Sequence, residues 1–521
     1  MPAHALPWRP VLLAAALLAG LGLNLGSLPL FDLDEGAFSE ATREMFVRGD
    51  FLSTSLYGAP RWDKPILIYW LQAASTRVLG FTELGFRLPS VLAALGWVGI
   101  LYYYVRRFAG REAAWNAALL LATTLQVSLI ARAAIADSLL NLCLTAAMLA
   151  TYAYWREGRR RDLYAASLAM ALGFLTKGPV ALLIPLAVSF LFYAGRRRLR
   201  DWWRLVTDLR AVALFLGVAG PWYAYQLWTH GWAFVEGFFL QHNLRRFQGP
   251  LEGHAGSLLY YLPVVLVGLL PHTVLWLQRL ARLGGDREDP WRLYLWLWFG
   301  FVFAFFSLSG TKLPHYVIYG YPALMALMAA GLPAWRGRGL LLLSPLIALF
   351  GFWLLVPGLL DWLAPRVTDP FARDVLAGAG TEFGTGYRLA AALGLASVAA
   401  AALVPRWPAW GRLGAGGVVM LAFLWGAFAP ALARVLQEPV REAARLARAQ
   451  DLEVVMWRIN APSFLVYSGR QVVRRRPRPG EVVLTKRIHL DELGPYRPLL
   501  LRHGIALVRL GKADKAPRSD S

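Results

Sequence analysis

Cysteine is almost absent from this 521-residue sequence: Cys143 is the only one, and it lies inside an apolar run. A single thiol cannot form an intrachain disulfide or a thiolate metal cluster. The sequence also contains no Walker loop, no dinucleotide fingerprint after a strand and no serine hydrolase elbow. A soluble nucleotide donor is therefore unsupported, and any activated group would have to arrive in a lipid-linked substrate.

Acidic residues are scarce, because 32 Asp and Glu stand against 54 Lys and Arg, which gives a formal net charge of +22. In a soluble protein such an excess would suggest a nucleic-acid partner. Here the arginines gather in short loops between apolar segments, where positive charge sets the orientation of a membrane protein. We therefore expect no nucleic-acid partner.

Long apolar runs are what the chain has in abundance, and 57% of its residues are hydrophobic. This composition predicts a mainly α, polytopic protein embedded in a lipid bilayer, with about thirteen transmembrane helices. The expected spans lie near residues 10–28, 88–105, 113–131, 138–155, 163–175, 179–194, 210–228, 257–277, 292–308, 316–334, 339–357, 386–404 and 413–433. The first run resembles a signal peptide, but we favour an uncleaved anchor because no clear small-residue cleavage site follows it.

Charge in the loops predicts which side of the membrane each loop faces. Every second loop is basic, as the positive-inside rule requires of cytoplasmic loops. The arginines of these loops are Arg106, Arg107, Arg111, Arg156, Arg159, Arg160, Arg161, Arg196, Arg197, Arg198, Arg200, Arg204, Arg279, Arg282, Arg336, Arg338, Arg406 and Arg412. The other loops then face outward, and they hold nearly every unusual polar residue.

The sequence predicts two domains. Residues 1–433 form the membrane domain, whose first outward loop, 29–87, contains amphipathic segments at 37–47 and 66–79 that we expect at the membrane interface. The tail, 434–521, is expected to be a small outward-facing soluble α/β domain. It is predicted to have a helix at 438–449 and strands at 452–457, 464–467, 481–484 and 505–510.

An acidic segment directly follows the first apolar helix and contains Asp34 and Glu35. Carboxylates at a membrane edge are costly to desolvate, so their placement there suggests a function. Either could act as a base that accepts the proton of an attacking hydroxyl. The alternative is that Asp34 only caps the amides of an interfacial helix. Arg43 and Glu44, further along that helix, are expected to be solvated.

Lysines on the outward side are candidates for holding a phosphate. Lys64, preceded by Asp63 and followed by Tyr69, is expected to bind phosphate together with Tyr69, although anchoring to lipid headgroups in an aromatic belt would also explain it. Lys177 lies in a tight break between two apolar helices and requires either an anionic partner or snorkelling to the interface.

Asp137 is a second acidic candidate, because it lies in a very short outward turn with Arg132. A salt bridge between Asp137 and Arg132 is the alternative to a site role.

Two further outward loops contain histidines and cations. One loop has His242, Arg246 and His254, and the other has Lys312 and His315. Phosphate contact by Arg246 and Lys312 is the favoured use of the positive charge. A divalent metal remains possible, with Asp63, His242, His254 and His315 as candidate ligands, although their spacing matches no standard zinc pattern.

Taken in order, these residues resemble the glycosyltransferase family that includes lipid A aminoarabinose transferases and protein O-mannosyltransferases. The matching motifs are Asp34-Glu35 with Glu40 and Arg43-Glu44-Met45, Gly49-Asp50, Lys64-Pro65 with Tyr69-Trp70, Arg87-Leu88-Pro89, Leu175-Thr176-Lys177-Gly178-Pro179, His242-Asn243 with Arg246-Phe247, and Lys312-Leu313-Pro314-His315-Tyr316. The motifs run through residues 34–316 and are much less specific for substrate than for the family.

The resemblance implies a membrane fold of the C type and a polyprenyl-phosphate sugar as donor. It also implies a bacterial inner-membrane protein whose active site faces the periplasm. By motif match, Asp34 is the catalytic carboxylate, Asp137 the second acid of the site and Lys64 the group that holds the donor phosphate. Aminoarabinose transferases commonly have glutamate before that lysine, and this chain departs from them at Asp63, a position connected with their metal site.

The function predicted from these features is inverting transfer of a sugar from the donor to lipid A, another envelope glycolipid or a protein. The main alternative is a polyprenyl-lipid transporter or binding protein that holds the lipid phosphate without chemistry. A transporter is expected to have polar sites on both faces, whereas this chain concentrates them on one. A phosphoethanolamine-type transferase lacks support, because no nucleophile and metal cluster is recognisable.

Overall fold

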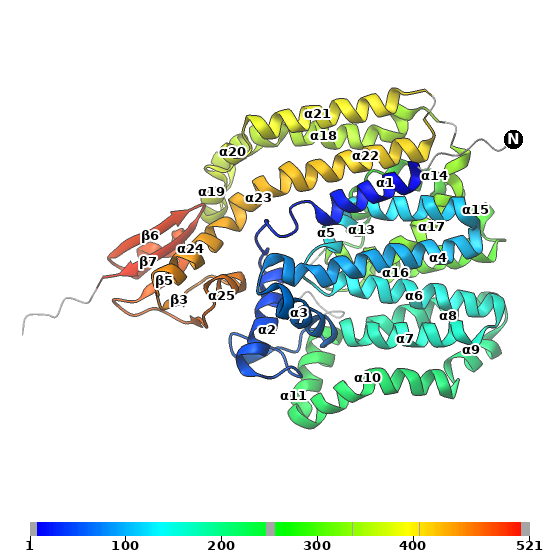
Figure 1. Cartoon of the computed structure of the whole chain (residues 1–521), viewed down its shortest axis with the longest axis horizontal. Helices are drawn as coiled ribbons and strands as arrows, with labels where there is room; N and C mark the ends of the chain where they lie inside the picture. The colour runs from blue at the N-terminus through cyan, green and yellow to red at the C-terminus, as the bar shows by residue number, and fades with distance from the viewer. Residues whose placement is uncertain (1–7, 246–255, 336, 406, 512–521) are drawn as a thin grey trace, which may run out of the picture.

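The structure is a computed structural model, and it describes residues 8–245, 256–335, 337–405 and 407–511. Most of these residues form a bundle of helices that run along its long axis (Figure 1). The helices of the bundle are α1 (Trp8–Leu17), α4 (Glu83–Thr123), α5 (Leu125–Ala131), α6 (Asp137–Glu157), α7 (Arg160–Lys177), α8 (Val180–Gly195), α9 (Leu199–Val206), α10 (Leu209–His230), α11 (Trp232–Phe234), α13 (Tyr261–Gly268), α14 (Thr273–Leu280), α15 (Leu283–Asp286), α16 (Pro290–Leu308), α17 (Tyr321–Gly331), α18 (Gly339–Leu363), α19 (Pro370–Leu376), α20 (Ala379–Glu382), α21 (Thr385–Leu403), α22 (Ala409–Phe423) and α23 (Ala429–Leu436).

Five helices in the described part of the chain are long and apolar enough to cross a membrane. They cover 83–123, 290–308, 339–366, 385–403 and 409–436, and the bent pair α9 and α10 makes a sixth if it counts as one span. Several other expected spans correspond to helices that are shorter or interrupted. The expected span 257–277, for example, is divided into α13 and α14. The larger number of about thirteen spans stays a prediction.

The expected spans 88–105 and 113–131 meet at a kink. Gly110 has a left-handed backbone with φ 88°, which breaks the regular helix inside α4. Glycine adopts this conformation at no steric cost, so the chain turns there without strain. Thr124 then separates α4 from the short α5. The arginine-rich stretch expected between two spans therefore lies around this kink.

One end of the bundle carries residues 29–87, the loop expected to face outward. It contains α2 (Asp34–Arg48), a hairpin of β1 (Ser55–Leu56) and β2 (Ala59–Pro60), and α3 (Leu67–Leu79). The expected solvation of Arg43 and Glu44 is wrong, because both side chains are buried. Arg43 forms a two-pronged pair with Glu40, and Glu44 accepts a hydrogen bond from Ser55. The helix α2 is thus packed between other elements and does not lie on a free surface.

The C-terminal residues form a separate α/β unit beyond the same end of the bundle. We call residues 438–511 the C-terminal unit; it contains α24 (Glu438–Ala449), β3 (Val454–Met456), α25 (Pro462–Ser468), β4 (Val473–Arg474), β5 (Val482–Lys486), β6 (Tyr496–Arg502) and β7 (Ile505–Leu510). Its sheet has the order β4-β3-β5-β7-β6, parallel between β4, β3 and β5 and antiparallel between β5, β7 and β6.

The expected helix at 438–449 has the bounds of α24, and the strands expected at 481–484 and 505–510 correspond to β5 and β7. The expected strand at 464–467 is wrong, since these residues lie in α25. Its core side chains, such as Phe464 and Leu465, pack with those of α24. A boundary between two domains at 433 stays a prediction, because α23 passes into α24 through Gln437 alone.

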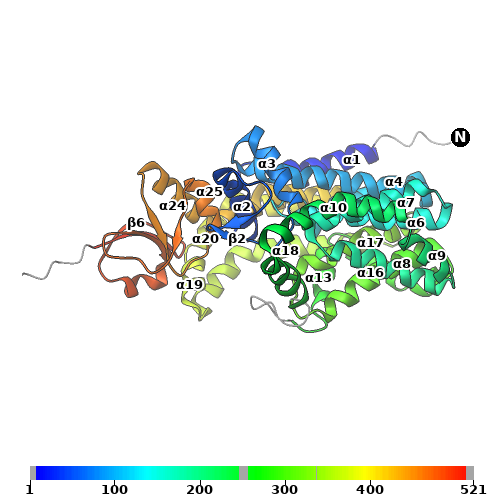
Figure 2. The same cartoon turned by 90° about the horizontal axis from the view of Figure 1, so that it is seen from below.

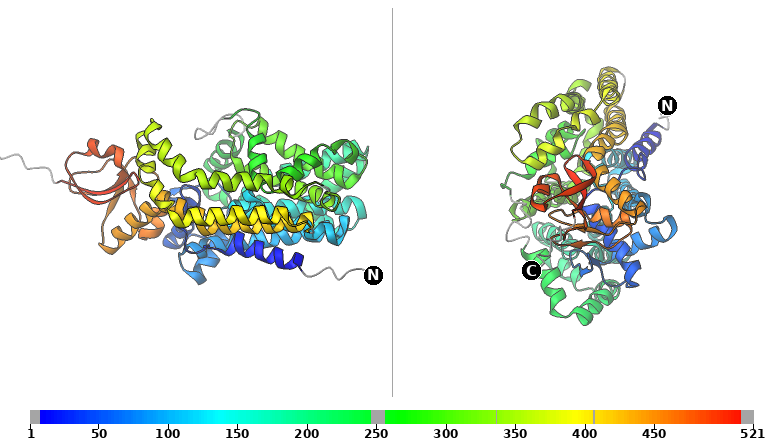
Figure 3. Two further views of the ribbon diagram at one scale, coloured as in Figure 1. Left: turned by 90° about the horizontal axis from the view of Figure 1, so that it is seen from above. Right: turned by 90° about the vertical axis from the view of Figure 1, so that its left-hand side faces the viewer.

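Three views agree on how these parts are arranged. The sheet projects beyond one end of the bundle (Figures 1, 2 and 3), while α9 lies at the opposite end (Figures 1 and 2). The elements α2, α24 and α25 lie between the sheet and the bundle (Figure 1). The acidic segment that begins α2 is therefore at the junction between the membrane helices and the C-terminal unit.

Candidate functional site

A cavity of about 390 Å³ opens at the end of the bundle that carries α2 and α3. It is lined by Asp63, Lys64, Lys177, Pro179, Val180, Leu183, Phe239, His242, Phe305, Phe306, Ser309, Tyr316 and Tyr319. Two lysines therefore face a space whose other walls are largely apolar and aromatic. Such a lining suits a ligand with an anionic head and a hydrocarbon body.

Lys177 closes α7 and meets Asp137, the first residue of α6. Its Nζ donates to Asp137 Oδ1 at 2.6 Å and to the hydroxyl of Tyr319 at 2.8 Å. The Tyr319 hydroxyl also donates to Asp137 Oδ1 at 2.7 Å. The salt bridge between Asp137 and Arg132, which was the alternative to a site role, does not form, since Arg132 lies over the ring of Trp425 at 3.9 Å. Asp137 thus orients Lys177 toward the cavity.

Lys64 lies on the side of the cavity formed by the loop 29–87, between β2 and α3. Its Nζ donates to the carbonyl oxygen of Asp63 at 2.9 Å, and the Asp63 carboxylate lies 2.9 Å from His242 Nε2 and 3.2 Å from Arg61. These partners hold the pKa of Asp63 below its usual range, although burial opposes them. Because the Asp63 carboxylate stays ionised, it offsets the positive charge of Arg61 and Lys64 on this side of the cavity.

An apolar groove continues from the cavity along α8. It is lined by Phe174, Pro179, Leu182, Leu183, Leu186, Ala187, Phe190 and Trp202, and it shares Pro179 and Leu183 with the cavity. Residues 183, 186, 187 and 190 recur at helical spacing, so they form one stripe of α8. A hydrocarbon chain whose charged head lies at Lys177 could follow this stripe away from the polar end.

Asp34 is the first residue of α2, and its side chain is exposed. The N-cap position is occupied by Leu33, which makes no side-chain capping bond, so Asp34 is not the N-cap residue. The charge of Asp34 favours the protonated forms of Arg61 and His315, which places the carboxylate within electrostatic reach of both. Asp34 is therefore an accessible carboxylate, as a general base requires, although it is not among the residues that line the cavity.

Glu35 has a different environment from its neighbour. Its two oxygens accept a two-pronged pair from Arg87, at 2.8 and 2.7 Å, and backbone N–H bonds from Phe31 and Ala134. These donors lower the pKa of Glu35 despite its full burial. Four hydrogen bonds from inside the protein occupy both of its oxygens, which favours a structural role. The catalytic role expected of Glu35 from the sequence stays a prediction.

Two of the expected phosphate ligands are also engaged elsewhere. Tyr69 is fully buried and stacked on Phe38 at 5.3 Å between ring centroids, and burial raises the pKa of its hydroxyl to about 12. Lys312 is buried, and its Nζ donates to the carbonyl oxygens of Ser307 and Ser309 at the end of α16. Neither residue is among those that line the cavity, so their described contacts favour packing and helix termination.

Three of the four candidate metal ligands, Asp63, His242 and His315, lie in the described residues, and they do not form one cluster there. Asp63 and His242 contact each other, whereas His315 lies 3.7 Å from Asp137. Burial lowers the pKa of His315 to about 4, more than the charge of Asp137 raises it. No group of three potential metal-ligating side chains occurs in the part of the chain that the structure describes. Arg246 and His254 lie outside the described residues.

Sequence reasoning missed several residues that shape the site. Tyr319 follows Tyr316 by three positions in a 3-10 helix (Pro314–Gly320), a spacing that puts both on one side. The aromatic spacing was a usable signal. Phe239 and Phe305 carried none, because aromatic residues are frequent throughout the apolar helices.

The fold and the site together define a polytopic membrane protein. At one end of its bundle, a cavity with two lysines and nearby carboxylates continues into an apolar groove. The model of the dolichyl-phosphate-mannose-protein mannosyltransferase family matches residues 63–223. An undecaprenyl phosphate-alpha-4-amino-4-deoxy-L-arabinose arabinosyl transferase from Pectobacterium carotovorum subsp. carotovorum is 30% identical over 434 residues, which cover 81% of this chain and 75% of that relative. A transferase of the same description from Aeromonas salmonicida is 31% identical, over 59% of this chain and 57% of its own length.

The chain therefore belongs to the membrane glycosyltransferase family that contains the aminoarabinose transferases and the protein O-mannosyltransferases. A solved structure agrees in fold. ArnT from Cupriavidus metallidurans, crystallised with undecaprenyl phosphate, matches with a TM-score of 0.80 over 97% of this chain and 98% of that chain, at 21% identity. This similarity identifies the fold as that of ArnT.

Proposed function

We propose that this protein is an inverting glycosyltransferase that moves a monosaccharide from a polyprenyl-phosphate donor to an envelope glycolipid such as lipid A. The proposed location is the bacterial inner membrane, with the site on the periplasmic face. The observation that carries the proposal is the cavity in which Lys64 and Lys177 face one space that continues into an apolar groove. A lipid-linked phosphate has the two chemical parts that this lining accommodates.

In the proposed reaction, an acceptor hydroxyl attacks the anomeric carbon of the donor sugar. Asp34 takes the hydroxyl proton while the bond between the anomeric carbon and the phosphate oxygen breaks. Polyprenyl phosphate leaves with the bonding electron pair, and Lys64 and Lys177 stabilise the charge that develops on it. Asp137 and Tyr319 act indirectly in this proposal, because they hold the Lys177 ammonium in place.

The chain's own residues also bear on a possible divalent metal. Asp63 and His242 supply one carboxylate and one imidazole in contact, which is fewer protein ligands than a closed structural site uses. An ion held there would have to complete its coordination with substrate oxygens or water. The reaction above needs no step at this pair.

The proposal is tested by replacing Asp34 with Asn, which keeps the size of the side chain and removes its basicity. Envelope glycolipids are extracted from cells that lack the gene, cells with the wild type and cells with Asp34→Asn, and their masses are compared. We expect one sugar mass to be added by the wild type only, with transfer by Asp34→Asn lowered by about a hundredfold or more. Asp491→Asn, the same change at an exposed aspartate of the C-terminal unit, serves as the matched control.

Normal transfer by Asp34→Asn at equal protein level contradicts the assignment of the base. An unchanged glycolipid profile with and without the gene contradicts the glycolipid acceptor and turns the search to protein acceptors. Binding of undecaprenyl phosphate without any transferred sugar supports the transporter or lipid-binding alternative.

A further inference from the structure

The short segment before the proposed base is held by side chains from two parts of the molecule. Arg87 of α4 holds it from the membrane side, by donating to the carbonyl oxygens of Leu25, Leu28 and Pro29 at 2.9, 2.7 and 2.8 Å. The same guanidinium forms the pair with Glu35. The path of the chain from the first membrane helix into α2 is thus fixed on one side by a buried arginine.

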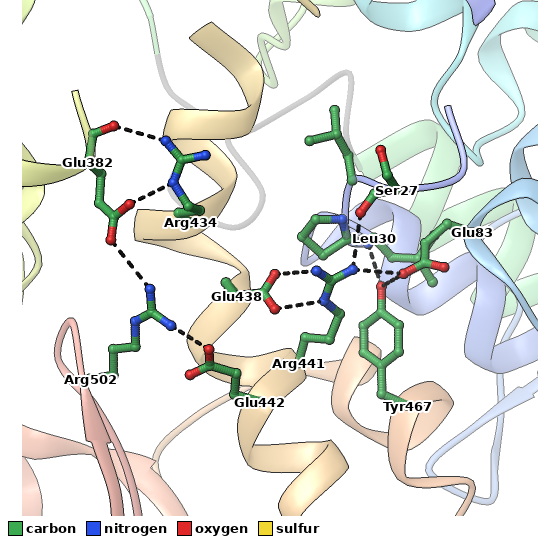
Figure 4. Close-up of polar contacts among 12 residues, drawn as sticks. Ser27, Leu30, Glu83, Glu382, Arg434, Glu438, Arg441, Glu442, Tyr467 and Arg502 are labelled. Atoms are coloured by element: carbon green, nitrogen blue, oxygen red, sulfur yellow. Dashed lines mark hydrogen bonds and ion pairs between the residues drawn. The ribbon is translucent and has the colours of Figure 1, made fainter. Parts of the chain in front are cut away.

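The C-terminal unit holds the same segment from the other side. Arg441 of α24 donates to the carbonyl oxygen of Ser27 at 3.1 Å and pairs with Glu83, and the N–H of Leu30 donates to the Tyr467 hydroxyl at 2.7 Å (Figure 4). Tyr467 also donates to Glu83 at 3.1 Å, so the two contacts form one network (Figure 4). Arg441 and Tyr467 therefore bind the Ser27 carbonyl and the Leu30 N–H, two backbone groups of the segment that Arg87 does not contact.

Ser463 of α25 holds Asp32, the residue two positions before the proposed base. Its N–H and its hydroxyl donate to the two oxygens of Asp32, at 2.9 and 2.5 Å. Gly36 in the first turn of α2 faces this pair, and a side chain there would collide with Asp32 and with the Ser463 nitrogen. The start of α25 is therefore seated against the first turn of α2, which begins at Asp34.

A second attachment of the C-terminal unit does not touch this segment. Arg502 of β6 pairs with Glu382 of α20 and with Glu442 of α24, while Arg434 of α23 donates to Glu382 at 2.6 Å (Figure 4). These contacts also join the unit to the bundle, but they reach its other side. Breaking these contacts weakens the attachment of the C-terminal unit to the bundle without removing any contact to residues 27–32, so they serve as an internal control.

We propose that Ser463 and Tyr467 are positioning residues, through which the C-terminal unit holds segment 27–32 and thereby sets the place of Asp34. The inference rests on the proposed function, because it assigns the unit a part in that reaction. Asp34 is exposed, and its side chain makes no hydrogen bond or ion pair with the residues that the structure describes. The backbone on either side of Asp34, segment 27–32 and the first turn of α2, therefore determines where the carboxylate lies. A displacement of a base by about 1 Å can cost a hundredfold in rate.

The test uses the full-length protein with Tyr467→Phe and Ser463→Ala, and with Arg502→Gln as the matched control. Amide hydrogen exchange is measured over residues 27–36, together with binding of undecaprenyl phosphate and the amount of sugar transferred in cells. In Tyr467→Phe the Leu30 amide loses its acceptor, so we expect its exchange to rise by about tenfold or more. Transfer is expected to fall by about tenfold to a hundredfold while lipid binding stays at the wild-type level.

The control separates positioning from mere attachment. Arg502→Gln is expected to leave exchange over 27–36 and transfer unchanged, and to raise exchange near Glu382. Ser463→Thr, which retains the hydroxyl, is expected to restore most of the transfer that Ser463→Ala loses, which also covers the case in which the alanine variant folds poorly.

The inference is overturned if amide exchange over residues 27–36 in Tyr467→Phe and Ser463→Ala equals that of the wild type. It is also overturned if Arg502→Gln loses as much transfer as these two variants. If wild-type protein fails to bind undecaprenyl phosphate, the proposed function fails instead. The exchange measurement still decides whether the C-terminal unit holds the segment.

Discussion

Two clusters at opposite ends of α6 use the same kinds of residue for different purposes. Asp137 begins this helix and Glu157 ends it, so they lie about 30 Å apart. At the Glu157 end, Arg107 gives two hydrogen bonds to Glu157 and two to Asp162. At the Asp137 end, Lys177 has one carboxylate and one tyrosine and also faces a cavity.

The difference shows how a structural ion pair can be told from a site. Arg107 directs its guanidinium at two carboxylates, one at the end of α6 and one at the start of α7. Such a two-sided pair is how a partly buried arginine stabilises a fold. Lys177 is oriented by its partners but remains at the wall of a space that a ligand can enter. Both residues are partly buried and paired, and only Lys177 lines a cavity.

Among the tests of this comparison between the two ends of α6, the largest effect is expected from Lys64→Gln, which removes a charge from the cavity wall. Loss of a charged hydrogen bond to a phosphate is worth about 1.5 to 3 kcal/mol, so affinity for undecaprenyl phosphate is expected to fall by about tenfold to a hundredfold. Binding is measured by tryptophan fluorescence of the purified protein in detergent. The thermal unfolding midpoint is expected to stay close to that of the wild type. Unchanged affinity would remove Lys64 from the site.

Arg107→Gln is expected to lower the stability of the protein and to leave its affinity for undecaprenyl phosphate unchanged. It leaves the carboxylates of Glu157 and Asp162 without their common partner, which we expect to cost roughly 1 to 3 kcal/mol of stability. The midpoint of thermal unfolding in detergent is expected to fall, while affinity for undecaprenyl phosphate stays at the wild-type value. Weaker lipid binding in this variant, at a temperature where it is folded, would break the distinction between the two ends.

The smallest effect concerns pH and the contact between Asp32 and Ser463. Burial raises the pKa of Asp32 from its ordinary value near 3.8 to about 7; the hydrogen bonds from Ser463 oppose this rise, and the charge of Glu35 adds to it. Because the pKa is raised in the folded state, the protonated form contributes stability below about pH 4, and this contribution is lost as pH rises through about 7.

Exchange over residues 27–36, corrected for the intrinsic dependence of exchange on pH, is therefore expected to increase between pH 6 and pH 8 in the wild type. Asp32→Asn, which cannot ionise, is expected to flatten this dependence. An equal increase in Asp32→Asn would assign the pH effect to another group.

The sequence predicted much of the helical framework because hydrophobic periodicity is a local signal. The expected span 138–155 falls within α6, and the expected helix 438–449 is α24. The strand expected at 464–467 failed for a physical reason. A run of four apolar residues has no room for a period to distinguish helix from strand, and Pro462 favours the start of a helix. The strand β6 was missed because Pro498 interrupts its pattern, which an edge strand tolerates.

The site was predictable to the extent that charge at the membrane edge is unusual. Lys64, Lys177 and Asp137 were identified in this way, and the structure brings the two lysines to one cavity. Glu35 could not be separated from Asp34 by sequence, because its partner Arg87 is 52 positions away. The same is true of Asp32 and Ser463, which meet only after the C-terminal unit has folded onto the bundle.

The most direct test of the account is the position of undecaprenyl phosphate in a cryo-EM structure of the full-length protein in a lipid nanodisc. The account predicts that the phosphate contacts Lys64 and Lys177, and that the first isoprene units follow the stripe of α8 at Leu183 and Leu186. A phosphate bound away from both lysines, with the lipid outside the α8 groove, would contradict it.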